Sequence, residues 1–159
     1  VVRILIRNTS SAPLYRRQLL ILEDGDEGWI LTKSTELPDG IYLLPYRTRI
    51  PAGFYPAGSE SEWRSEDGKN VLGSTALNSS TEVYNYDRGN ETWEYIGFTP
   101  QGTSQTGAGS LVLVTGRERS GVDVANGSFP LEISNPENVR GVKVSTYGIP
   151  RLINDRTGF

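Results

Sequence analysis

The sequence predicts a mainly β protein whose antiparallel sheets form a sandwich-like globular domain. Glycine and proline are frequent, with 18 and 9 among 159 residues, and both residue types favour turns over helix interiors. The apolar residues occur in short runs that often alternate with polar residues, as they do in half-buried strands. No stretch has the apolar spacing of a long amphipathic helix. Many short strands joined by turns are therefore expected.

The first half of the chain contains one clear hairpin among four predicted strands. The strands are apolar or β-branched runs bounded by turn residues, and they cover Val1–Arg7, Gln18–Glu23, Trp29–Lys33 and Ile41–Pro45. Ser10 or Ser11 could instead cap a helix before the second run, but the unbroken apolar character of that run favours a buried strand. The turn residues of Asp24–Gly28 separate the second and third runs, which predicts a hairpin.

The second half contains the remaining predicted strands. They cover Thr81–Tyr86, Thr92–Thr99, Ser110–Thr115, Phe129–Ser134, Arg140–Thr146 and Arg151–Asn154. Ser110–Thr115 is the most apolar of them and is expected at the centre of a sheet. Pro130 indicates an edge position for its strand, and Gly116–Gly121 is predicted to be a charged turn.

We expect residues 1–159 to form a single globular domain, because one core commonly serves a chain of this length. Apolar periodicity disappears between about residues 46 and 70, where proline, glycine, serine and glutamate accumulate. This stretch is predicted to be a long surface loop, and such loops often carry function.

The charge pattern argues against nucleic acid as a partner. The net charge is −3, and the 16 lysine and arginine residues are scattered along the chain. A phosphate-binding surface needs a concentrated positive footprint. The sequence also contains no run approaching the roughly 20 apolar residues that span a bilayer.

Missing residue types argue against an enzyme. The chain has no histidine and no cysteine, which removes the most common general base and the thiolate and imidazole metal ligands. Paired carboxylates could still catalyse glycoside hydrolysis, but no distinctive pair stands out. We expect no catalytic residue, no cofactor and no metal site.

The acidic turn from Asp24 to Glu27 offers an alternative to the expectation that the chain has no metal site. Its carboxylates could bind Ca²⁺, but the turn lacks the distant bidentate glutamate and the spacing of a calcium loop. A solvated hairpin turn is the favoured interpretation.

Aromatic residues supply the candidate contact sites for a partner or a glycan. Tyr55 and Trp63 fall in the predicted loop, whereas Tyr84 and Tyr86 share one face of an alternating strand with Val83 on the other. Exposed tyrosine and tryptophan can stack on sugars or anchor a protein partner. Trp29 and Trp93 are expected instead to fill the core.

The chain contains no methionine, so Val1 is not expected to be the native start. We expect a leader, an anchor or a neighbouring domain to have been removed.

A set of motifs then occurs in a recognisable order. They are Trp29 followed by Leu37–Ile41, the turn Phe98–Gly102, the apolar strand Leu111–Val114, the alternating Val142–Ser145, and Tyr147–Arg151. In this order they resemble the globular domain of minor pseudopilins of type II secretion and of minor type IV pilins. The resemblance covers about Trp29 to Arg151, without the loop from Tyr46 to Ser80.

The resemblance implies a pilin-like fold and a structural role in the cell envelope. Members of that family carry an N-terminal hydrophobic helix that anchors the subunit and packs in the filament core, and this chain lacks such a segment. The implied partners are other pilin-like subunits or secretion components, and the membrane would be reached only through the missing helix. The implied location is extracytoplasmic, periplasmic or at the cell surface, with the full-length form anchored in the inner membrane. The alternative function is a β-sandwich carbohydrate-binding or adhesin module.

Overall fold

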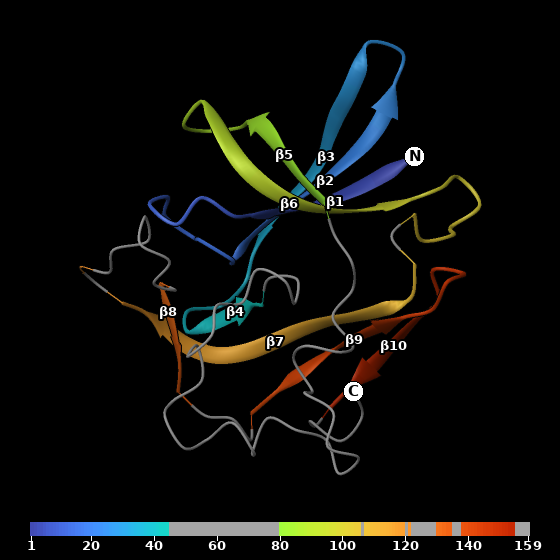
Figure 1. The fold of residues 1–159 in the computed structure, drawn as a ribbon. Coiled ribbons are helices and arrows are strands. Elements are labelled where there is room, and N and C mark those ends of the chain that lie inside the picture. Colours follow the sequence, from blue (N-terminus) through green and yellow to red (C-terminus); the bar gives the residue numbers. More distant parts are fainter. Residues whose placement is uncertain (45–79, 106, 120, 122–129, 135–137, 155–159) are drawn as a thin grey trace.

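The fold is built entirely from antiparallel strands in the part of the chain that is described. The computed structural model describes residues 1–44, 80–105, 107–119, 121, 130–134 and 138–154. These residues form ten strands and no helix, in two sheets (Figure 1), so the mainly β prediction is confirmed. No helix among them could cross a membrane. The predicted loop at about 46–70, with Tyr55 and Trp63, lies outside the described residues.

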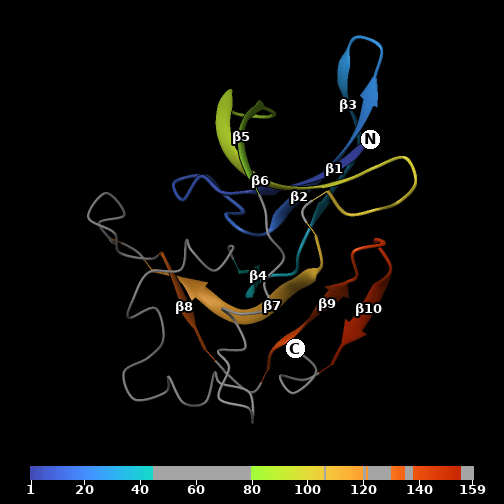
Figure 2. The same cartoon turned by 45° about the vertical axis from the view of Figure 1, so that its right-hand side comes forward.

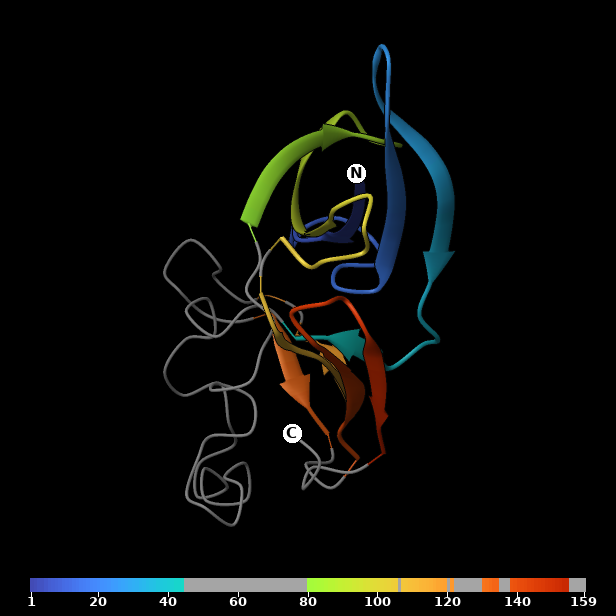
Figure 3. The ribbon, with the colours of Figure 1, turned by 90° about the vertical axis from the view of Figure 1, so that its right-hand side faces the viewer.

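The first sheet has five strands in the order β3-β2-β1-β6-β5. Their bounds are β1 Val2–Arg7, β2 Gln18–Gly25, β3 Gly28–Glu36, β5 Ser80–Asn85 and β6 Asn90–Phe98. The predicted hairpin is confirmed, since β2 pairs with β3 from Gln18↔Glu36 to Gly25↔Gly28. The sheet curls strongly, so that β3 and β5, its two edge strands, approach each other on its inner side (Figure 3).

The second sheet has the order β10-β9-β7-β4, and β8 pairs with the end of β7. Their bounds are β4 Ile41–Leu43, β7 Gly109–Glu118, β8 Leu131–Ile133, β9 Arg140–Val144 and β10 Pro150–Ile153. The apolar strand at Ser110–Thr115 is central as predicted, because β7 lies between β9 and β4 (Figure 2). Its core is the buried set Tyr15, Tyr42, Leu44, Val112, Val114, Leu131, Ile133 and Val139.

The two sheets meet through a smaller apolar cluster. Ile96 from β6 packs with Val144 from β9, and both are buried. Partly buried neighbours from both sheets surround them, namely Ile4, Phe98, Leu111 and Val142. The outer face of the first sheet therefore covers part of the second.

The predicted turn at Gly116–Gly121 is wrong in its first half. β7 continues to Glu118, because β8 pairs with Gly116–Glu118 and supplies the hydrogen-bonding partner. The approach is close, since a Cβ on Gly116 would lie 2.6 Å from the carbonyl oxygen of Glu132. Glycine at this position thus allows the strand to extend where its sequence suggested a turn.

Candidate functional site

The inner face of the curled first sheet gathers aromatic and charged side chains from β1, β3, β5 and β6. Alternation places Arg3, Leu5 and Arg7 on one face of β1, opposite Gly97, Tyr95 and Trp93 of β6. We call the resulting group the inner-face cluster; it comprises Arg3, Arg7, Trp29, Tyr84, Tyr86, Trp93 and Tyr95. Leu5, Leu20 and Leu22 form its buried apolar base.

Arg3 lies between two aromatic rings in this cluster. Its guanidinium carbon is 4.1 Å from the ring centroid of Trp29 and 4.4 Å from that of Tyr95. Both distances allow cation–π attraction. Arg3 Nη1 also donates a 2.6 Å hydrogen bond to Glu82 Oε2. Arg3 therefore connects β3, β6 and β5 across the inner face.

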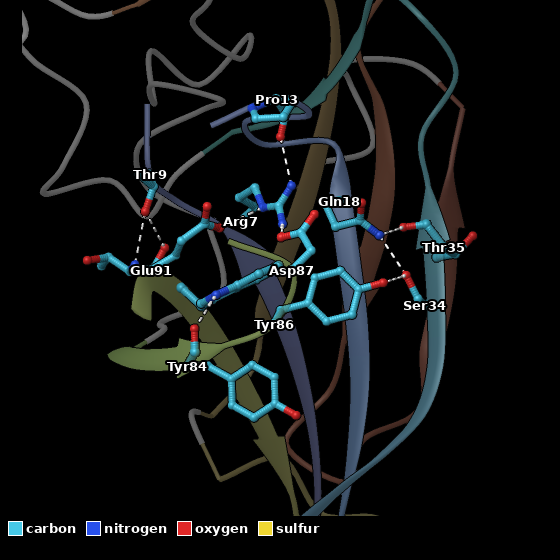
Figure 4. A network of polar contacts seen from close by, with 12 residues as sticks. Arg7, Thr9, Pro13, Gln18, Ser34, Thr35, Tyr84, Tyr86, Asp87 and Glu91 are labelled. Carbon is cyan, nitrogen blue, oxygen red and sulfur yellow. Dashed lines mark hydrogen bonds and ion pairs between the residues drawn. The ribbon is translucent and has the colours of Figure 1, made fainter. Parts of the chain in front are cut away.

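Arg7 is held by carboxylates and a backbone carbonyl although it is completely buried (Figure 4). Its Nη2 pairs with Asp87, and its Nη1 donates a 2.9 Å hydrogen bond to the carbonyl of Pro13. Its Nε lies 3.0 Å from Glu91 Oε2, which is close enough for an ion pair although the angle does not make a hydrogen bond. The guanidinium is thus largely neutralised where solvent does not reach it.

A hydrogen bond from Tyr86 closes the curl of the sheet. The Tyr86 hydroxyl donates to Ser34 Oγ at 3.0 Å, and Gln18 Nε2 donates to the same oxygen at 2.7 Å. Figure 4 shows the Tyr86 ring reaching from the end of β5 toward β3. The ring also meets Trp93 edge-on, with centroids 6.1 Å apart. Tyr86 therefore joins the two edge strands of the first sheet.

The structure places the predicted aromatic residues as their alternation suggested. Tyr84 and Tyr86 lie partly buried against the inner-face cluster, and Val83 on the opposite face is 66% exposed. Trp93 is completely buried, as expected of a core residue, and the half-buried Trp29 packs against the same cluster.

Most charged side chains of the inner face form ion pairs with one another. Glu82, Asp87 and Glu91 each contact an arginine. Burial raises the pKa of Glu82, and the nearby Arg3 opposes this rise. Within the described ranges no three carboxylate side chains gather in a group that could hold a metal ion. The predicted turn of Asp24–Gly28 is shorter in the structure, because Asp24 still pairs with Trp29; Asp26 and Glu27 form the turn, and all three acidic residues are exposed.

A second buried arginine was not anticipated from the sequence. Arg16 is completely buried, pairs with Glu94, and donates 2.8 Å hydrogen bonds to the carbonyls of Leu43 and Leu44. Its φ of 59° is in the left-handed region, which is costly for a side chain of this kind. The ion pair lies between the two sheets and ties β6 to the end of β4. The sequence contained one signal of this buried pair, because the acidic Glu94 alternates with Ile96 and Phe98 on an otherwise apolar face of its strand.

Two of the motifs in the sequence come together in space. The turn at residues 98–104 is closed by a hydrogen bond from the Thr99 amide to the Thr103 carbonyl at 2.9 Å. The turn between β9 and β10 packs directly on it, since a Cβ on Gly148 would lie 1.7 Å from the Gly102 carbonyl oxygen. We call residues 98–104 and 145–149 the turn junction.

Backbone hydrogen bonds fix the second turn of this junction. The Ser104 amide donates to the Thr146 carbonyl at 3.1 Å, and the Gly148 amide donates to the Ser145 carbonyl at 2.9 Å. Gly148 has a φ of 73°, which a residue with a side chain rarely adopts. The junction joins the end of β6 to the β9–β10 hairpin and presents Tyr147 and Ile149 to solvent, at 77% and 66% exposure.

Comparison of the chain with protein-family models, with curated proteins and with solved structures finds no match.

Proposed function

We propose that this chain is a structural and interaction subunit that binds other proteins through its strand and turn surfaces and performs no catalysis. The observation that carries the proposal is the turn junction. In this junction the turns of two sequence motifs contact each other and are joined by hydrogen bonds, and Tyr147 and Ile149 are exposed to solvent. Rigid, exposed aromatic and apolar side chains are well suited to anchor a partner, because little entropy is lost when they bind.

The inner face of the first sheet supports the same proposal. Its arginines and carboxylates form ion pairs with one another, so they stabilise the curl of the sheet. A general acid or base must instead be able to reach a substrate proton. The charged residues thus have a structural explanation that requires no reaction.

In its specific form, the proposal is that the chain is the head domain of a pseudopilin- or pilin-like protein with a sandwich-like fold. The order of the motifs supports this form, as does the contact between Phe98–Gly102 and Tyr147–Arg151. The domain would then lie outside the cytoplasm, in the periplasm or at the cell surface, and would contact other pilin-like subunits or secretion components.

The coding sequence upstream of Val1 tests the pilin-like form. We expect a leader that ends in glycine, followed by phenylalanine and an apolar run of about 20 residues, which is long enough to span a bilayer. An upstream sequence that encodes a polar domain or no further residues would overturn the pilin-like form.

A second candidate function is carbohydrate binding at the inner face. Tyr84, Tyr86 and Trp29 are partly exposed there beside paired charges, and aromatic rings can stack on sugars. Titration with polysaccharides, followed by tryptophan fluorescence, tests this function because Trp29 and Trp93 lie in the cluster. Saturable binding that is lost in Tyr84→Ala would favour it over the protein-interaction role.

A further inference from the structure

Two exposed hairpins of this chain carry opposite charge together with apolar side chains. The first is the tip of the β2–β3 hairpin, residues 23–31, which we call the acidic tip. The second is the β9–β10 hairpin, residues 140–152, which we call the basic hairpin. They belong to different sheets and point in different directions (Figures 1 and 3).

The acidic tip concentrates negative charge on a protruding hairpin. Its four carboxylates are Glu23, Asp24, Asp26 and Glu27, all of them exposed, and none has an ion-pair partner within the described part of the chain. Ile30 and Leu31, at 58% and 38% exposure, lie beside them. The tip therefore offers negative charge and apolar surface together.

The basic hairpin places two like charges opposite each other. Lys143 of β9 and Arg151 of β10 are a cross-strand pair in the antiparallel ladder, and both are exposed. Like charges in this position destabilise a sheet. Neither residue has an acidic partner among the residues whose placement is described. The exposed Arg140 adds a third positive charge to the same hairpin.

Apolar side chains surround the positive charges of the basic hairpin. Tyr147, Ile149 and Leu152 are 77%, 66% and 74% exposed. β10 is also a terminal strand of its sheet, so its outer edge has no strand neighbour within the described residues. The turn junction holds this hairpin in place without covering these side chains.

We propose that the acidic tip of one copy of this chain docks on the basic hairpin of a second copy. The argument is charge complementarity: the chain has a net charge of −3, yet Arg140, Lys143 and Arg151 lie on one hairpin and form no ion pair among the described residues. Because the two surfaces differ, the contact is heterologous, and repetition produces a ring or an open filament. This inference rests on the proposed function and names a second copy as one partner of the interaction subunit.

Sedimentation equilibrium of the whole chain tests the contact. We expect self-association with a Kd of about 1 mM or tighter at an ionic strength of about 0.01 M. Raising the ionic strength to about 1 M shortens the Debye length from about 30 Å to about 3 Å and should weaken association by at least about tenfold. A chain that stays monomeric at low ionic strength overturns the proposal.

Charge reversal distinguishes this contact from general aggregation. Asp26→Lys with Glu27→Lys, or Lys143→Glu with Arg151→Glu, should each abolish association, because the first change leaves the tip without net charge and the second makes the hairpin negative like the tip. A chain with all four substitutions should associate again, since the lysines at positions 26 and 27 of one copy can then pair with the glutamates at positions 143 and 151 of the next. Lys33→Glu with Arg88→Glu is the matched control: it changes net charge as the hairpin variant does, but outside both surfaces, and should preserve association.

Circular dichroism of each variant confirms that these surface substitutions leave the fold intact. Two outcomes overturn the proposal. One is association that survives in both paired variants, and the other is a four-fold variant that remains monomeric. Either outcome leaves the proposed function standing, because the upstream coding sequence tests the pilin-like form independently.

Discussion

In the first sheet, arginines, carboxylates and aromatic rings occupy most of the inner face, whereas the core of the second sheet consists of aliphatic side chains and two tyrosines. Hydrophobic residues make up only 36% of the chain, so aliphatic side chains are limited. The inner side of the curled sheet is filled instead by the aliphatic stems of arginines and by aromatic rings, and the charged ends of the arginines pair with carboxylates. The stability of the first sheet should thus depend on electrostatics and on the geometry of the aromatic rings. The stability of the second sheet should depend on how completely its buried apolar side chains fill the core.

The largest expected effect comes from breaking the ion pair that β6 contributes between the sheets. Glu94→Leu leaves the charge of the buried Arg16 without its carboxylate, which should lower the free energy of unfolding by about 3–5 kcal/mol. Urea denaturation of wild type and variant measures this difference.

A double-mutant cycle shows whether the loss belongs to the pair. Arg16→Met combined with Glu94→Leu should cost less than the sum of the two single changes, by about 0.5–3 kcal/mol. Strict additivity of the two changes would contradict the role assigned to the pair.

In the second sheet, truncating a core side chain should lower stability only through the loss of buried apolar volume. Leu131 is 2% exposed in the core cluster, and Leu131→Ala should cost about 2–5 kcal/mol through lost burial and the cavity left behind. Denaturation at low and high salt should give the same loss. A loss that changes markedly with salt would remove the distinction between the two sheets.

A substitution that conserves charge should test ring geometry in the first sheet. Arg3→Lys keeps a positive charge near Glu82 but removes the planar group stacked between Trp29 and Tyr95. Arginine and lysine are not equivalent at such a site, and the expected cost is about 0.5–2 kcal/mol. Near-ultraviolet circular dichroism should change as well, because Trp29 loses its stacking partner; an unchanged spectrum and stability would show that charge alone matters.

The strands themselves could be predicted from the sequence, because alternation and turn residues are local properties. The hairpin of β2 and β3, the central place of β7 and the shared face of Tyr84 and Tyr86 all followed from such patterns. The extension of β7 to Glu118 did not, since it depends on pairing with β8.

The partners of the charged residues could not be predicted, because they are far apart in the chain. Arg7 meets Asp87, and Arg16 meets Glu94, only after β1 and β6 pair as neighbours. Strand order decides these contacts, and no local pattern specified that order. A charged residue within an apolar alternation shows that a partner is needed, but it does not show which residue supplies it.

The smallest expected effect concerns the dependence of stability on pH. Burial raises the pKa of Glu82, so the folded chain holds this proton more tightly than the unfolded chain. The resulting stabilisation is present below the unfolded pKa and is lost as the pH rises through the folded pKa. Between about pH 4 and pH 7, the melting temperature of wild type should therefore fall relative to that of Glu82→Gln, which cannot ionise.

Removing the opposing charge sharpens the same test. Arg3 lowers the pKa of Glu82 against the effect of burial, so Arg3→Met should raise this pKa further. Its melting temperature should then fall over a wider pH range, relative to a chain that carries both Arg3→Met and Glu82→Gln. If the two curves stayed parallel, Glu82 would not be the group that responds, and the inner face of the first sheet would contribute no pH dependence through this residue.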